Sequence, residues 1–89
     1  MRKRARVDRN QVEVVAAIRK AGGEVLHLHQ IGDGCADILV MYHSVLLLME
    51  IKSEGGRMTS DEQAFYNRWQ DCMVVVYSAE EALEAIGRL

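Results

Sequence analysis

Proline is absent from this chain, so its loops are expected to be short and few. The two cysteines, Cys35 and Cys72, have neither the spacing of a disulfide framework nor that of a zinc ribbon, and we interpret them as reduced thiols of a cytoplasmic protein. No apolar run approaches the roughly 18 residues that cross a membrane. The basic start continues into a helical pattern rather than into the apolar segment of a signal peptide. These absences argue against a disulfide scaffold, a zinc ribbon and a membrane protein.

What remains is the composition of one small globular domain covering residues 1–89, with 49% hydrophobic and 27% charged residues. The net charge of −2 conceals a gradient, because residues 1–20 carry seven basic and two acidic side chains, whereas residues 59–89 carry two basic and six acidic ones. Residues 1–8 form a basic arm, which is either a solvated terminus or a contact to nucleic-acid phosphate. The candidate DNA contacts in this arm are Arg2, Lys3, Arg4 and Arg6.

Periodicity and capping signals predict three helices and four strands. Asp8 with Gln11 is a capping-box pair before the first helix, and Ser78 with Glu81 is another before the last. The continuous apolar run at residues 73–77 is typical of a strand covered on both faces. The order α-β-β-β-α-β-α, with a right-handed crossover into the fourth strand, predicts an α/β sandwich with a mixed four-stranded sheet. The expected helices cover residues 9–21, about 60–71 and 79–87, and the expected strands cover residues 24–30, 36–42, 45–51 and 73–77.

Two groups of side chains are assigned no functional role. Phe65, Trp69 and Tyr77 are interpreted as core residues rather than as platforms for stacking bases. The histidines and cysteines match no pattern with the geometry of a zinc site; they are His27, His29, His43, Cys35 and Cys72. Carboxylates are therefore the main candidates for chemistry.

The two central strands meet at the polar pair His43-Ser44. If they pair as a hairpin there, Tyr42 faces Val45, and counting back places Asp37 opposite Glu50, with Lys52 on the same face. Directly opposed residues have Cβ atoms about 4.5–5.5 Å apart, where like charges are destabilising. A shared Mg²⁺ or Mn²⁺ would resolve this repulsion; the alternative is a structural ion pair in which Lys52 neutralises the carboxylates.

This arrangement resembles the PD-(D/E)XK nuclease superfamily, and within it the small stand-alone VRR-NUC domains of phages and bacteria. The residues that carry the resemblance are Glu13 in the first helix, Asp37 in Gly34-Cys35-Ala36-Asp37, the run Glu50-Ile51-Lys52, and Gln63 in the helix that follows. The chain departs from the family at Ala36, where a proline is usual, and in lacking a visible Val-Arg-Arg string. The resemblance spans nearly the whole chain and implies a restriction-endonuclease-like sandwich.

The resemblance also implies roles for the central residues. Asp37 and Glu50 would bind Mg²⁺ or Mn²⁺ together with the backbone carbonyl of Ile51. Lys52 would orient a water or stabilise charge that develops on the phosphate.

Three further residues keep two interpretations each. Glu13 either joins the metal shell, directly or through water, or is an exposed surface residue. Gln63 either hydrogen-bonds a metal-bound water or the phosphate, or completes a capping box at a helix start for which Glu62 is the other candidate partner. Arg57 either contacts a phosphate or is an ordinary loop residue.

The leading hypothesis is a metal-dependent DNA endonuclease, working as a homodimer and selecting branched DNA such as four-way (Holliday) junctions in a bacterial or phage-infected cell. The absence of a base-reading module favours recognition of shape over sequence. The alternative is a non-catalytic DNA-binding or assembly module that retains the nuclease fold. A small interaction protein with an acidic cation site is a third possibility.

Overall fold

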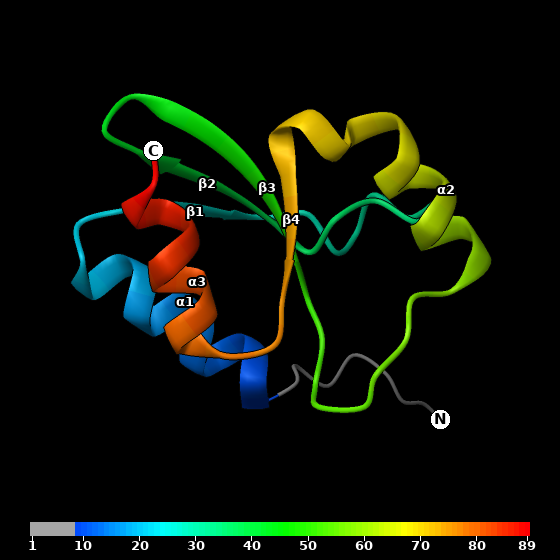
Figure 1. The fold of residues 1–89 in the computed structure, drawn as a ribbon, viewed down its shortest axis with the longest axis horizontal. Helices are drawn as coiled ribbons and strands as arrows, with labels where there is room; N and C mark the ends of the chain where they lie inside the picture. Colours follow the sequence, from blue (N-terminus) through cyan, green and yellow to red (C-terminus); the bar gives the residue numbers. More distant parts are fainter. Residues whose placement is uncertain (1–8) are drawn as a thin grey trace.

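Four strands form one mixed, open sheet in the order β1-β2-β3-β4 (Figure 1). β1 pairs antiparallel with β2, β2 pairs antiparallel with β3, and β3 pairs parallel with β4. The parallel pair is joined by the helix α2, Ser60–Trp69, and the short 3₁₀ helix η1, Gln70–Cys72. The strands are β1 Glu24–His27, β2 Ile38–Tyr42, β3 Val45–Ile51 and β4 Met73–Val76. The predicted α/β class, mixed sheet and element order are confirmed.

The structure is a computed structural model that describes residues 9–89. The basic arm of residues 1–8 lies outside these residues, and so do its candidate DNA contacts and the proposed N-cap Asp8.

The hairpin between β2 and β3 has the predicted register, with Tyr42 paired to Val45 and Ile38 paired to Met49. His43 and Ser44 form its turn with φ values of 50° and 66°, the backbone twist that two-residue hairpin turns require. One more step along this register places Asp37, just before β2, opposite Glu50 in β3.

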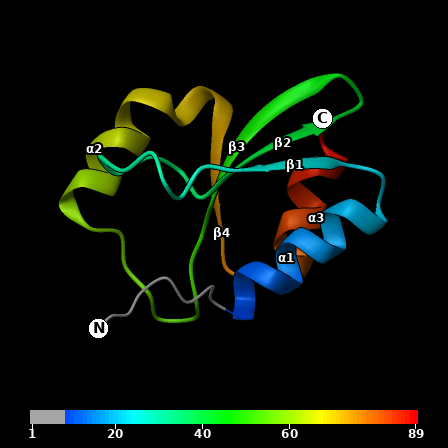
Figure 2. The same cartoon turned by 180° about the vertical axis from the view of Figure 1, so that it is seen from behind.

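Two helices cover one face of the sheet. α1, Arg9–Lys20, and α3, Ala79–Gly87, lie side by side on that face in both views (Figures 1 and 2). They bury apolar side chains against alternate residues of the strands, as the pleat of a sheet requires. The core contains Val14, Val15, Ile18, Val25, Ile38, Val40, Leu47, Met49, Ile51, Val76, Ala82, Ala85 and Ile86.

The remaining α-helix, α2, stands apart from this core and has no buried residue. Its N-cap is Thr59, which forms a complete capping box with Glu62. The loop before β2 packs closely on the start of α2, because a Cβ atom at Gly34 would collide with the carbonyl of Asp61. α2 is thus held by its first turn near the ends of β2 and β3.

The boundaries differ from the sequence-based expectation at several ends. β1 stops at His27 and β2 starts at Ile38 because their ladder ends in the bond from the Leu28 N–H to the Asp37 carbonyl, after which the chain turns. The helices α1 and α2 end one and two residues earlier than expected. β4 ends at Val76 and lies at the sheet edge, so its two central valines are only half-buried rather than covered on both faces.

The interpretation of Trp69 and Tyr77 as core residues is wrong, since they are 45% and 40% exposed. Trp69 stacks on Phe65 at a ring-centroid distance of 5.4 Å. Because α2 does not pack into the main core, these two rings cover each other at its surface instead.

Candidate active site

The candidate site lies on the sheet face opposite α1 and α3. Met49 and Ile51 of β3 point into the core, so the alternating residues Glu50 and Lys52 face the other way. The side chains of Glu50 and Lys52 meet with 3.3 Å between Oε2 and Nζ. Asp37 reaches the same strand end, where its Oδ2 accepts a hydrogen bond of 2.8 Å from the Ile51 N–H. The predicted grouping of these residues is therefore present.

Glu50 is the most unusual residue of the group. Its side chain is 2% exposed, and Oε1 has no hydrogen-bond partner among the residues that the structure describes. Burial, followed by the charges of Asp37 and Glu62, raises the pKa of Glu50 to about 8. A buried polar atom without a partner is costly and calls for an explanation, and a bound cation would supply one.

Asp37 is half-buried, and its orientation is fixed by the backbone of β3. Burial raises its pKa, against the opposing effects of the Ile51 N–H and the positive charge of Lys52. The carboxylate is thus held beside Glu50, with its Oδ2 atom directed to Ile51.

Glu62 of α2 is a site residue whose role was not predicted. Its Oε1 accepts hydrogen bonds from Lys52 Nζ at 2.7 Å and from the Thr59 N–H at 2.9 Å. Burial alone would raise the pKa of Glu62, but the hydrogen bonds from Lys52 and Thr59 outweigh it and lower that pKa. The carboxylate therefore stays ionised beside the Lys52 ammonium.

Lys52 is correspondingly held as a cation. Burial alone would lower its pKa, but the hydrogen bond to Glu62 and the negative charge of Glu50 outweigh this and raise it. Glu62 was recognisable in the sequence only as a capping residue. The contact to Lys52 depends on where α2 returns to the sheet, and no local pattern encodes that position.

Glu13 is not brought to this cluster. Its side chain is 57% exposed and pairs with Arg9 at 3.4 Å. The reason is that α1 covers the opposite face of the sheet. The residue of α1 that does reach the strand ends is Asn10, whose Nδ2 donates to the carbonyls of Lys52 at 2.7 Å and Tyr77 at 3.1 Å.

Gln63 also lies outside the cluster. It is exposed, and its Nε2 donates to Asn67 Oδ1 at 2.9 Å, while the capping box uses Glu62 instead. Arg57 is exposed in the loop between β3 and α2, which leaves its role as a phosphate contact a prediction.

Within residues 9–89, no three or more His, Cys, Asp and Glu side chains are grouped so that they could hold a metal ion. The residues at this strand end that could contribute to holding a cation are the two carboxylates of Asp37 and Glu50. Oxygen atoms of this kind suit Mg²⁺, which keeps several waters and takes only one or two carboxylates from a protein. The partnerless Oε1 atom of Glu50 fits such a ligand.

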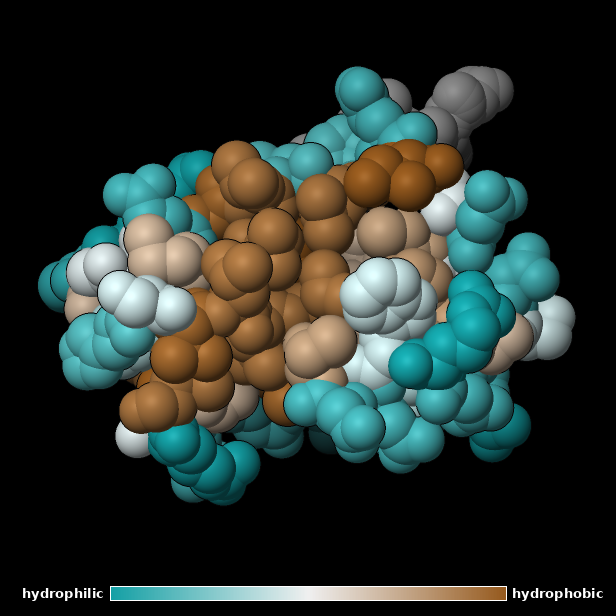
Figure 3. All heavy atoms as spheres, turned by 90° about the horizontal axis from the view of Figure 1, so that it is seen from above, coloured by the Kyte–Doolittle hydropathy of each residue, from teal (hydrophilic) through white to brown (hydrophobic). Residues whose placement is uncertain are grey.

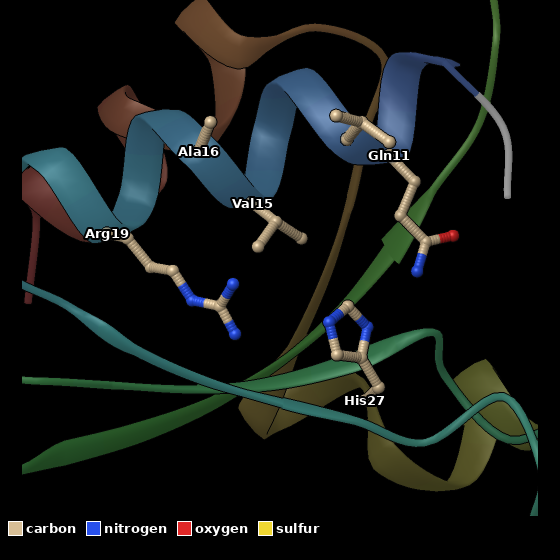
Figure 4. Close-up of a pocket in the computed structure, with 6 residues that line it drawn as sticks. Gln11, Val15, Ala16, Arg19 and His27 are labelled. Carbon is tan, nitrogen blue, oxygen red and sulfur yellow. The ribbon is translucent and has the colours of Figure 1, made fainter.

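A separate pocket lies between α1 and β1, on the other side of the sheet from Glu50. Figure 4 shows Arg19, His27 and Gln11 directed into the space below the helix. The pocket has a volume of about 350 Å³ and is lined by Gln11, Val12, Val15, Ala16, Arg19 and His27. It contains no carboxylate and does not contribute to the candidate site.

No helix within residues 9–89 is both long enough and apolar enough to cross a membrane. The chain matches no protein-family model, no curated protein and no solved structure.

Proposed function

We propose that this protein is a metal-dependent endodeoxyribonuclease with a restriction-endonuclease-like fold. The element order α-β-β-β-α-β-α and the sheet order β1-β2-β3-β4 support this proposal. The observation that carries it is the buried carboxylate of Glu50, 2% exposed, with one oxygen lacking a partner, beside Asp37 and Lys52. A structural ion pair alone would leave that oxygen unexplained.

Asp37 and Glu50 would hold a Mg²⁺ or Mn²⁺ ion together with the Ile51 carbonyl. When bound, such an ion supplies Lewis-acid polarisation of the phosphate and lowers the pKa of a coordinated water. The Ile51 N–H keeps the Asp37 carboxylate oriented for this role, at 2.8 Å from Oδ2.

Lys52 provides a fixed positive charge next to these carboxylates. Glu62 holds its ammonium at 2.7 Å, so the charge is positioned before a substrate arrives. A preorganised cation of this kind stabilises negative charge that develops on a phosphate during cleavage. Glu62 thus acts on the reaction through Lys52, as a positioning residue.

The proposed substrate is branched DNA, with four-way junctions as the leading case. Basic side chains such as Arg57 contact phosphates and carry no sequence information, so selectivity would come from DNA shape. The likeness to small VRR-NUC proteins points the same way, and a cytoplasmic setting in a bacterial or phage-infected cell stays a prediction.

The test compares a four-way junction, a flap and linear duplexes of varied sequence at one salt concentration, with Mg²⁺, Mn²⁺ or EDTA. We expect cleavage of the junction that requires metal and that falls by at least about 100-fold in Asp37→Ala, Glu50→Gln and Lys52→Ala. The matched control is Glu84→Gln, an exposed carboxylate of α3 paired with Arg88 at 3.9 Å, which should cleave normally.

A second measurement reads metal binding without activity. Mn²⁺ should raise the melting temperature of the wild-type protein and of Glu84→Gln, because a ligand that binds only the folded state stabilises it. Glu50→Gln should lose this shift. Full cleavage by Glu50→Gln with an unchanged circular dichroism spectrum would overturn the proposal, and a metal shift without any cleavage would favour a non-catalytic module.

A further inference from the structure

The pocket between α1 and β1 lies where the helix overhangs the edge strand of the sheet. α1 supplies two neighbouring rows of side chains, because residues four apart recur on one side of a helix. These rows are Gln11, Val15 and Arg19, and Val12 and Ala16. β1 supplies His27, which faces α1 because it alternates with Leu26 and follows the pleat of the buried Val25. One helix and one strand, rather than a loop, therefore build this pocket.

Three polar side chains point into the pocket from its two walls. Arg19 and Gln11 reach into it from α1, and His27 rises toward them from β1 (Figure 4). Within residues 9–89, none of these three side chains forms an ion pair or a hydrogen bond. The guanidinium, the amide and the imidazole all carry N–H donors, so the pocket offers converging donors to a ligand.

The charge of the pocket lining is positive. Arg19 carries a full charge there, and no carboxylate lines the pocket. The acidic residues of the same two elements are directed elsewhere: Glu13 pairs with Arg9 at 3.4 Å, and Glu24 lines a hollow on the other face of the sheet. The pocket therefore favours an anionic group.

The rest of the lining is apolar. Val15 is 6% exposed and closes the inner wall, whereas Val12 is 55% exposed and would be covered by an apolar group in the pocket. The volume of about 350 Å³ falls within the range of small-molecule sites, which combine an apolar lining with a few converging polar groups. Both features suit a ligand that is apolar at one end and anionic at the other.

The opposite face of the sheet lacks this combination. Figure 3 shows a broader hydrophobic surface there, with hydrophilic residues around it. Its hollow beside β1 is lined by apolar side chains and by Glu24, and no cationic side chain of residues 9–89 lines that hollow. Of the two faces, the one under α1 thus has the chemistry that selects an anion.

We propose that the pocket between α1 and β1 binds a small organic monocarboxylate, with the carboxylate at Arg19 and His27 and the apolar body against the valines and Ala16 of α1. The fork of an arginine matches the two oxygens of a carboxylate, and the imidazole N–H can add a third hydrogen bond. One guanidinium balances one negative charge, whereas a phosphate monoester carries roughly −1.5 to −2 at pH 7. The Gln11 amide closes the far end, where it can bond a polar substituent.

The experiment titrates the isotope-labelled wild-type protein with 3-phenylpropanoate and follows the backbone amide signals by NMR, in EDTA and without DNA. A ligand of this size should bind with a dissociation constant on the order of 1 mM or tighter. The largest shifts should fall at residues 11–19 and at His27. Because the pocket and Glu50 lie on opposite faces of the sheet and neither metal nor cleavage is involved, failure of this proposal is distinguishable from failure of the proposed function.

Three further compounds test the chemistry of recognition. 3-Phenylpropan-1-ol keeps the ring without the charge, and acetate keeps the charge without the ring, so each should bind at least about tenfold more weakly than 3-phenylpropanoate. Inorganic phosphate at the same concentration should not displace 3-phenylpropanoate, because it has no apolar body and carries more charge than Arg19 balances.

Arg19→Gln should weaken the binding of 3-phenylpropanoate at least about tenfold, through loss of charge-assisted hydrogen bonds, and leave the weaker binding of the alcohol unchanged. The matched control is Lys20→Gln, which removes the neighbouring positive charge of α1 outside the pocket lining and should bind as the wild type does. If Arg19→Gln does not fold by circular dichroism, Ala16→Leu replaces it. Ala16 is exposed on α1, so the larger side chain should fill the pocket and weaken both compounds.

Several results would overturn the proposal. They are the absence of saturable binding, equal binding of the alcohol, displacement by inorganic phosphate, and shifts centred away from the pocket. Equal losses in Arg19→Gln and Lys20→Gln would overturn it as well, because the attraction would then be one of overall charge.

Discussion

Glu62 of α2 and Lys52 of β3 are joined by a hydrogen-bonded ion pair of 2.7 Å, shorter than the 3.3 Å between Lys52 and Glu50. The lysine of the candidate site is therefore held mainly from the helix, not by its neighbour on the strand. The same Glu62 oxygen accepts from the Thr59 N–H, so helix capping and lysine positioning share one carboxylate.

The first prediction separates these two roles. Glu62→Ala should lower kcat for junction cleavage by about tenfold or more with little change in KM, because a charge-assisted hydrogen bond of about 1.5–3 kcal/mol is lost. Thr59→Ala removes the hydroxyl that caps the Glu62 N–H and leaves both the Thr59 N–H and Lys52 bonded to the Glu62 carboxylate, so it should cost about 1 kcal/mol of stability while leaving kcat near wild type. Steady-state kinetics and urea unfolding of both variants are the measurements. Equal losses of kcat in the two would show that Glu62 acts only as a cap.

Gln63 serves as the neighbouring control in this experiment. Its amide bonds to Asn67 and not to the site, so Gln63→Ala should cleave at close to the wild-type rate. A large loss of kcat there would restore the role that the family resemblance assigns to Gln63.

The second prediction concerns pH and stability in the absence of metal. The pKa of Glu50 is about 8 in the fold, against 4.5 for an ordinary glutamate. The folded state thus favours the neutral carboxyl, and this stabilisation is complete below pH 4.5 and is lost as pH rises through about 8. In EDTA, the free energy of unfolding should fall between pH 5 and pH 9 by on the order of a few kcal/mol.

Glu50→Gln cannot ionise and should flatten this pH dependence, which urea unfolding at several pH values would show. A residual slope of the same sign should persist, because the pKa of Asp37 is raised as well, by burial first. An unchanged slope in Glu50→Gln would mean that Glu50 is not the buried titrating group.

The third prediction tests the contact between the loop before β2 and the first turn of α2. Gly34 has a φ of 78°, and a Cβ there would meet the backbone of Asp61 and Glu62. Gly34→Ala should therefore combine left-handed strain with overpacking and cost roughly 2–4 kcal/mol. Gly32→Ala is the control, since its φ is 81° but nothing lies within 4 Å of the added Cβ.

The control should cost only about 1 kcal/mol, the strain of the backbone alone. Thermal and urea unfolding compare the two. Equal losses would indicate that the loop is free to move away from α2, and the position of Glu62 would then have to be set by other contacts.

The fold was predictable because its signals are local. Two continuous apolar runs on either side of the His43-Ser44 break set the hairpin register, and Ser78 with Glu81 marked the start of α3. These features depend on neighbours in sequence, so their positions could be read from the chain.

The parts that were not predictable depend on how distant elements pack. Glu13 faces solvent because α1 packs on the sheet face opposite the one that carries Glu50 and Lys52. Trp69 is exposed because α2 stands away from the core. An apolar or acidic residue in a helix does not reveal which face of a sheet its helix covers. For the same reason, Asn10 and Glu62 acquired their contacts to Lys52 only in the folded chain.

The contacts of Asn10 bear on the kinetics of folding. Its amide reaches Lys52, 42 residues away, and Tyr77, 67 residues away, whereas the β2–β3 hairpin closes between residues three apart. Contacts across long stretches of chain form slowly, because the entropy of closing the loop is lost before the contact is gained. A refolding chain should therefore complete its hairpin well before the strand end at Lys52 is secured.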